Sequence, residues 1–130
     1  MGVRFPSVFS TTLLNTVLGT NTETAIVTSP PFTPPLDSAQ IIIAVYWQAN
    51  MAAATTQMTN RIRRGSGLTG TQVNVFATDR VTASVGYSTT LIYVDTPGNV
   101  TGIQYTLTGS TVGAGGTGTI NDGFILVFAL

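Results

Sequence analysis

The chain has 130 residues, a formal net charge of zero and 8% charged residues, and it contains no cysteine, histidine or lysine. Most groups that titrate near neutral pH, bind transition metals or act as nucleophiles are therefore missing, which argues against an enzyme and against a bound cofactor. Neutrality also argues against nucleic-acid binding, and no apolar run approaches the roughly 20 residues that cross a bilayer. The length suits one domain.

The first 21 residues differ from the rest because large apolar side chains are mixed with Ser and Thr before regular strands begin. We expect this segment to be an extra edge strand or an arm that packs on another chain. Ser10–Leu18 fits a short helix or a strand. The candidate contact residues in the segment are Phe5, Phe9, Leu13 and Leu14.

Residues 22–130 are expected to form one all-β domain, because short segments rich in β-branched and aromatic residues are separated by Gly, Pro, Asn and Asp. The first clear strand is Thr22–Ser29, before a proline-rich loop. Gln40–Asn50 is apolar at both parities, so we expect it to be buried on both faces. Its aromatic residues, Tyr46 and Trp47, are predicted to be core.

The middle of the chain shows alternating strands. Thr55–Arg64 places Met58, Asn60 and Ile62 on one face, with Arg61 and Arg63 on the other, and Gly65-Ser66-Gly67 ends it. Further strands are predicted at Thr71–Thr78, at Thr89–Val94 and around Ile103, Tyr105 and Leu107, the last half-buried. Thr96–Asn99 has Pro and Gly where a type II turn needs them.

The C-terminal part is expected to contain a glycine-rich loop, Gly109–Gly118, and a tight turn, Asn121-Asp122-Gly123. The last strand, Phe124–Leu130, has no polar residue, so it belongs in the core or at a subunit interface. About eight strands, with turns every 8–12 residues, indicate a two-sheet antiparallel sandwich. The jelly roll is the favoured topology.

The spacing G-x-G-x-x-G occurs twice, at Gly65–Gly70 and at Gly113–Gly118. A dinucleotide-binding loop of this kind must lead into a helix whose N-terminus receives the pyrophosphate. Neither copy is followed by a helical pattern. Both are therefore expected to be ordinary loops.

Arg61, Arg63 and Arg64 form a charge cluster. Guanidinium forks match a carboxylate or phosphate on a partner, which makes the cluster a candidate contact site. The alternative is a solvated strand face paired with Asp79 or Asp95. The acidic residues are scattered and mostly adjoin turns, where an Asp commonly caps its own backbone.

Four segments resemble small jelly-roll virion proteins of bacterial viruses, namely capsid decoration, spike or fibre-head domains. They are Arg61-Ile62-Arg63-Arg64-Gly65, Leu68-Thr69-Gly70-Thr71, Val94-Asp95-Thr96-Pro97-Gly98 and Tyr105-Thr106-Leu107-Thr108. The resemblance covers roughly residues 22–130 and implies a two-sheet sandwich, self-association about a symmetry axis, commonly as a trimer, and no catalysis.

The resulting hypothesis is a structural virion protein, a capsid decoration or surface component located on the virion surface. Its expected partners are its own copies, with a trimer favoured, and the major capsid protein or another virion protein, with no nucleic acid and no membrane. Two alternatives stay open. One is a receptor- or glycan-binding fibre tip that uses the loops at Gly109–Gly118 and near Tyr87. The other is a self-polymerising extracellular fibre subunit whose N-terminal segment completes a neighbour's sheet.

Overall fold

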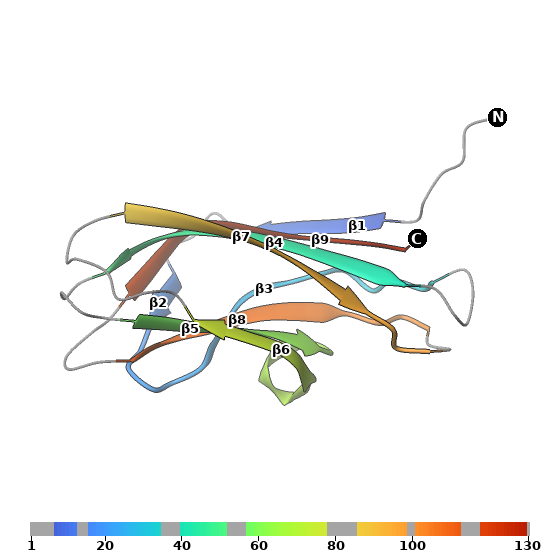
Figure 1. Cartoon of the computed structure of the whole chain (residues 1–130), viewed down its shortest axis with the longest axis horizontal. Helices are drawn as coiled ribbons and strands as arrows, with labels where there is room; N and C mark the ends of the chain where they lie inside the picture. Colours follow the sequence, from blue (N-terminus) through green and yellow to red (C-terminus); the bar gives the residue numbers. More distant parts are fainter. Residues whose placement is uncertain are drawn as a thin grey trace.

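A computed structural model of the protein describes residues 7–12, 16–34, 40–51, 57–77, 86–98, 101–112 and 118–129. Within these ranges nine β-strands form two antiparallel sheets that lie face to face (Figure 1). A single 3-10 turn, η1 (Gly67–Thr69), is the only helical element of the described residues. The described residues contain no helix that is long and apolar enough to cross a membrane. The predicted two-sheet antiparallel sandwich is confirmed.

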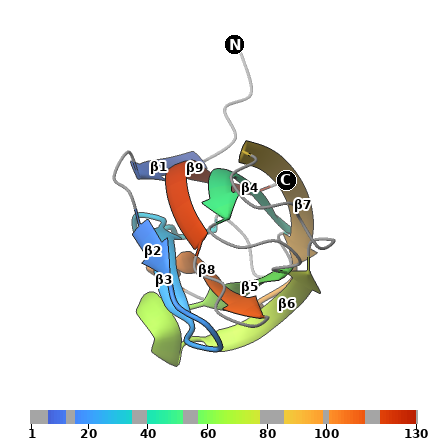
Figure 2. The ribbon, with the colours of Figure 1, turned by 90° about the vertical axis from the view of Figure 1, so that its left-hand side faces the viewer.

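Each sheet is defined by its strand order, which Figure 2 shows end-on. Sheet 1 runs β1 (Ser7–Thr12), β9 (Gly118–Ala129), β4 (Ile41–Met51) and β7 (Gly86–Asp95), and β2 (Thr16–Leu18) also pairs with β9. Sheet 2 runs β3 (Thr24–Thr28), β8 (Tyr105–Val112), β5 (Gln57–Arg64) and β6 (Thr71–Ala77).

The topology is that of one long antiparallel hairpin rolled up on itself. β5 pairs with β6, β4 with β7, β3 with β8, and both β1 and β2 with β9. Rolling then sets β9 beside β4 and β8 beside β5. This is the jelly-roll order, in which β1 and β2 together take the place of the first of eight strands.

The core lies between the sheets and is built from one parity of each strand. β4 contributes Ile41, Ile43, Val45, Trp47 and Ala49, all of them fully buried. Trp47 packs against Phe76 of β6 with ring centroids 5.3 Å apart, which places it in the core as predicted. Ile125 and Val127 of β9 lie beside them in sheet 1, and the side chains that face them from sheet 2 include Met58, Ile62, Tyr105 and Leu107.

The prediction that Gln40–Asn50 is buried on both faces is correct for one face only. Its other parity lies on the outer face of sheet 1, where Ala44 and Tyr46 are partly exposed. Tyr46 is therefore not in the core between the sheets. Instead it stacks on Phe124 of β9, with ring centroids 5.5 Å apart and planes at 23°. An apolar strand is buried twice only when something covers each face of its sheet.

Three predictions near the C-terminus are wrong. Gly109–Val112 is part of β8 rather than a loop, and β8 is buried on both faces along Tyr105–Thr111 rather than half-buried. Asn121-Asp122-Gly123 lies inside β9, where Gln48 pairs with Asp122 and the next residue, Ala49, pairs with Ile120. Asn121 is thus the extra residue of a β-bulge, which favours the same small polar residues as a turn.

The N-terminal segment contributes strands rather than a helix where the structure describes it. β1 pairs with β9 at six consecutive positions, from Ser7 opposite Phe128 to Thr12 opposite Gly123, and Phe9 lies opposite Leu126. β2 continues along the same strand, with Thr16 opposite Ile120. β1 therefore forms an edge of sheet 1.

Candidate functional site

The arginine cluster lies at the end of β5, in sheet 2. The alternation predicted for this strand is confirmed, because Met58, Asn60 and Ile62 are fully buried while Arg61 and Arg63 lie on the opposite face. Arg64 ends the strand beside Gly65, whose φ of 128° only glycine adopts readily. Arg61 and Arg63 therefore lie on the outer face of sheet 2, whereas Arg64 lies at the end of the strand, and each of the three has a separate role.

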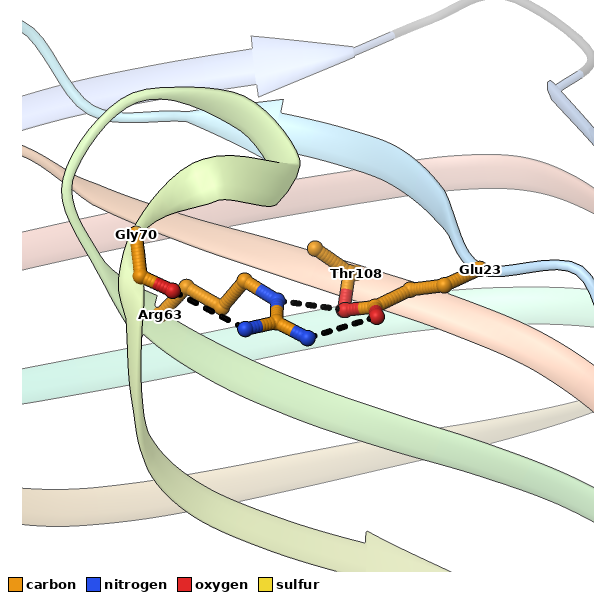
Figure 3. A network of polar contacts seen from close by, with 4 residues as sticks. All are labelled: Glu23, Arg63, Gly70 and Thr108. Carbon is orange, nitrogen blue, oxygen red and sulfur yellow. Dashed lines mark hydrogen bonds and ion pairs between the residues drawn. The ribbon is translucent and has the colours of Figure 1, made fainter.

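Arg63 joins three parts of the chain on the outer face of sheet 2 (Figure 3). Its Nε and Nη2 donate hydrogen bonds to Oε1 and Oε2 of Glu23, both at 2.7 Å, and its Nη1 donates to the carbonyl oxygen of Gly70 at 2.9 Å. The Thr108 hydroxyl also donates to Glu23 Oε1. Glu23 directly precedes β3 and Thr108 lies on β8, so the fork connects β3, β8 and the loop after β5.

The charges of this network stabilise one another. The hydrogen bonds from Arg63 lower the pKa of the Glu23 carboxyl to about 2, helped by the Thr108 hydroxyl, and they outweigh the effect of burial, which raises it. The same bonds raise the pKa of Arg63 above its ordinary value. Both groups are thus ionised over the whole physiological range, which suits a fixed structural pair better than a proton-transfer site.

Arg64 fastens the two sheets to each other at one end of the sandwich. Its Nε donates to Oδ2 of Asp95 at 2.9 Å, and its Nη2 donates to Oδ1. Asp95 ends β7 of sheet 1, whereas Arg64 ends β5 of sheet 2. Tyr105 of β8 donates its hydroxyl to the same carboxylate at 2.6 Å. The predicted pairing with Asp95 is confirmed for Arg64, while the pairing of Arg63 with Glu23 had no signal in the sequence.

Burial and pairing oppose each other at this second network. Burial alone raises the pKa of Asp95, but hydrogen bonds from Arg64 and Tyr105 hold the pKa below its ordinary value. Burial and the bond to Asp95 raise the pKa of Tyr105. The carboxylate is therefore a charged anchor for three strands, and Tyr105 stays protonated.

The first G-x-G-x-x-G segment is a loop, as predicted, and it folds over the outer face of its own sheet. The Thr106 hydroxyl donates to the carbonyl oxygen of Gly65 at 2.8 Å and accepts from the amide of Gly67 at 3.0 Å. Because the Thr106 hydroxyl has a single proton and donates it to Gly65, the Thr28 hydroxyl is the donor in the 2.9 Å hydrogen bond between Thr28 and Thr106. The loop thus forms hydrogen bonds with Thr106 of β8 instead of cradling a phosphate. Residues 113–117 of the second copy lie outside the described residues.

Of the three arginines, Arg61 alone makes no ion pair with another described residue. It is partly exposed and sits opposite Val75 of β6 and Thr108 of β8. The guanidinium donors of Arg63 and Arg64 are held internally, so Arg61 is the member of the cluster open to a partner. Phe5, Leu13, Leu14 and Asp79 fall outside the described residues, as does the side chain of Phe9.

The outer face of sheet 1 carries the more unusual surface. The register brings three rows of residues together across β7, β4 and β9. We call these nine positions the outer patch. Eight of the nine are apolar or aromatic, and none is charged. The rows are Val94, Ile42 and Phe128, then Ile92, Ala44 and Leu126, then Thr90, Tyr46 and Phe124.

Exposure in the outer patch rises toward β7. Ile92 is 66% exposed and Val94 is 45% exposed, whereas Ile42 in the middle is enclosed by its neighbours. The next row is polar, with Ser88, Gln48 and Asp122. A contiguous apolar area with a polar border is typical of a surface that binds a partner.

The two outer faces of the sandwich therefore differ in kind. Sheet 2 shows threonines, arginines and the covering loop, with their polar groups joined internally. Sheet 1 shows an uncharged apolar patch. The arginines were predicted as a contact site, whereas the patch was not, apart from the alternative that Phe124–Leu130 lies at a subunit interface. Strands that are apolar at both parities are the sequence signal of such a patch. No group of three or more potential metal-ligating side chains occurs in the part of the chain that the structure describes.

The fold is similar to that of proteins of known structure. No protein-family model and no curated protein matches the sequence. A chain in the structure of infectious bursal disease virus Gx strain is similar to 97% of this chain, with a TM-score of 0.65 and 12% identity. A chain of the T13 IBDV viral particle gives a TM-score of 0.63 over 95% of this chain, at 10% identity.

These comparisons establish the fold. A third similar structure, dimeric latent PorU from Porphyromonas gingivalis, gives a TM-score of 0.54 over 98% of this chain at 9% identity. The chain spans 32%, 30% and 13% of the lengths of these three proteins. The expected likeness to virion proteins is thus confirmed for the architecture, which proteins from virus particles share.

Proposed function

We propose that this protein is a structural component of a virion, a capsid decoration or surface protein that acts by assembling with its own copies and with the major capsid protein or another virion protein. The resemblance to bacterial-virus proteins suggests a place on the virion surface. The role is not enzymatic. The observation that carries the proposal is a jelly roll with an uncharged apolar outer patch.

Three further features support it. The similar chains of infectious bursal disease virus belong to a virus particle, so the same architecture serves in a virion. Four of the six charged residues that the structure describes are used to hold strands together, with Arg63 on Glu23 and Arg64 on Asp95. The overall net charge of zero leaves little repulsion between copies.

The test is the composition of the particle itself. Virions encoded by the genome that carries this gene are purified by density gradient, and the protein is quantified against the major capsid protein by mass spectrometry. The proposal predicts a fixed stoichiometric ratio and labelling of intact particles by an antibody to the protein. Absence from purified particles would overturn it.

Two assays separate the alternatives. Binding on a glycan array at micromolar concentration would favour a fibre tip, and filaments that lengthen with protein concentration would favour a self-polymerising fibre. The virion proposal predicts neither in the isolated protein.

A further inference from the structure

We infer that the outer patch of sheet 1 binds the same patch of a second copy, so that two jelly rolls pack back to back about a two-fold axis. This inference deepens the proposed function and rests on it, because it names the surface by which the protein assembles with itself. It puts a two-fold dimer in place of the trimer that the resemblance favours.

The chemistry of the patch requires a cover. In an antiparallel sheet that faces water, the outward parity is normally polar. Here the outward parity of β4 and β9 is as apolar as the inward parity across all three rows. Ile92, at 66% exposed, would gain most from being covered. Each large apolar side chain in the patch therefore favours association.

The charge pattern selects the partner. None of the nine positions is charged, so two identical patches meet without placing like charges opposite each other. A patch with one sign of charge would oppose self-association, because a two-fold contact brings the same surface of both copies together. The patch also has no cation or anion to select a charged ligand. A second copy of the chain fits these conditions directly.

The size of the face approaches that of a standard interface. β4, β7 and β9 contain 11, 10 and 12 residues, and β1 adds a fourth strand. Four strands at about 4.8 Å spacing and about 3.4 Å per residue give a face of about 650 Å². A standard interface buries about 800 Å² on each partner. The outer patch would be the apolar centre, and the row of Ser88, Gln48 and Asp122 would belong to the rim.

A matched pair of substitutions tests the surface. Ile92→Glu places a charge in the outer patch, on the last strand of sheet 1. Val75→Glu makes the same kind of change on the last strand of sheet 2, where Val75 is 49% exposed and lies opposite Arg61. Sedimentation velocity of the full chain should give a dimer for the wild type. We expect Ile92→Glu to raise the dissociation constant of the dimer by at least about 100-fold, because two carboxylates enter one contact. Val75→Glu should change this dissociation constant by less than about threefold.

A second measurement does not depend on disrupting the surface. Ala44 occupies the middle row and the middle strand of the outer patch, so a two-fold axis through the patch brings the two Ala44 residues close together. The chain has no cysteine, so Ala44→Cys introduces a unique thiol. A short bismaleimide should link Ala44→Cys chains into covalent dimers and leave Val75→Cys chains single.

The outcomes separate this inference from the proposed function. A wild type that is monomeric at all concentrations, a trimer without Ala44→Cys linkage, or a dimer unaffected by Ile92→Glu would overturn the two-fold contact, even if the protein is found in virions. A dimer that behaves as expected but is absent from purified virions would leave the contact standing and overturn the virion role.

Discussion

Glu23 and Arg63 lie 40 residues apart in the chain, and two hydrogen bonds of 2.7 Å join their side chains on the outer face of sheet 2. This fork ties the start of β3 to β5 across β8. Arg64 and Asp95 make a comparable fork between the two sheets. These two ion pairs thus act at places where separate strands must be held together.

Replacing Glu23 with Gln should destabilise the protein by about 1–3 kcal/mol, because Arg63 loses a charged acceptor while it remains largely buried. Urea unfolding followed by circular dichroism measures the change. The matched control is Asp122→Asn, the same acid-to-amide change at a residue that makes no ion pair with another described residue. Equal losses in the two variants would contradict a special role for the fork.

The stability should fall at acid pH through the same group. The pKa of Glu23 is about 2 in the folded protein, below its ordinary value of 4.5. The stabilisation is therefore fully present above pH 4.5 and is lost as the pH falls toward 2. Asp95, whose pKa is also lowered, adds a loss below its ordinary 3.8. Melting temperatures from pH 2 to 8 should be level between pH 5 and 8, where no histidine or cysteine titrates.

The Glu23→Gln variant provides the control for this pH profile. Because it removes the titrating carboxyl, its melting temperature should depend less on pH between 4.5 and 2 than that of the wild type. Parallel profiles for the two proteins would show that the acid sensitivity comes from elsewhere.

Thr106→Val should loosen the loop over sheet 2. The substitution keeps the shape of the side chain but removes the hydroxyl that bonds Gly65 and Gly67. We expect a loss of about 1–3 kcal/mol and faster hydrogen exchange at the Gly67 amide. The control is Thr59→Val. Thr59 lies on β5, on the same outer face of sheet 2 as Thr106, and its replacement removes no side-chain hydrogen bond made to another described residue. Unchanged exchange at Gly67 would show that Thr106 does not hold the loop.

Gly109→Ala should overpack the core. A Cβ at this position would lie 3.0 Å from Leu18 Cδ1, 3.1 Å from Asn60 Nδ2 and 3.1 Å from Ile26 Cδ1. We expect a loss of about 1–3 kcal/mol in urea unfolding. Gly19→Ala is the control, because the new Cβ would make only an ordinary 3.5 Å contact with Thr22. A stabilised Gly109→Ala protein would show that the three side chains move aside freely.

Local patterns predicted the fold class and most strands, because alternation reports which side of a strand faces the core. β5 shows this most clearly, with Asn60 correctly assigned to the buried face despite its polarity. Gly98 has a φ of 80°, as the third residue of the predicted type II turn requires, while Asn99, the fourth residue, lies outside the described residues.

Other features depend on distant contacts and had no local signal. Gly109 looks like a loop residue until three side chains from other strands are placed around it. Asn121 marks a bulge because of its pairing with β4, which its neighbours in sequence do not reveal. The doubly apolar pattern of β4 indicated two covered faces, but it did not distinguish a cover within the chain from one supplied by a partner.

The most direct test of this account is the solution mass of the wild-type chain, measured by light scattering across a wide range of concentration. One chain has a mass of 13.6 kDa. The account predicts a species of twice that mass that dissociates only on dilution, with the outer patch of sheet 1 covered in the dimer. A single species of 13.6 kDa at every concentration would contradict it.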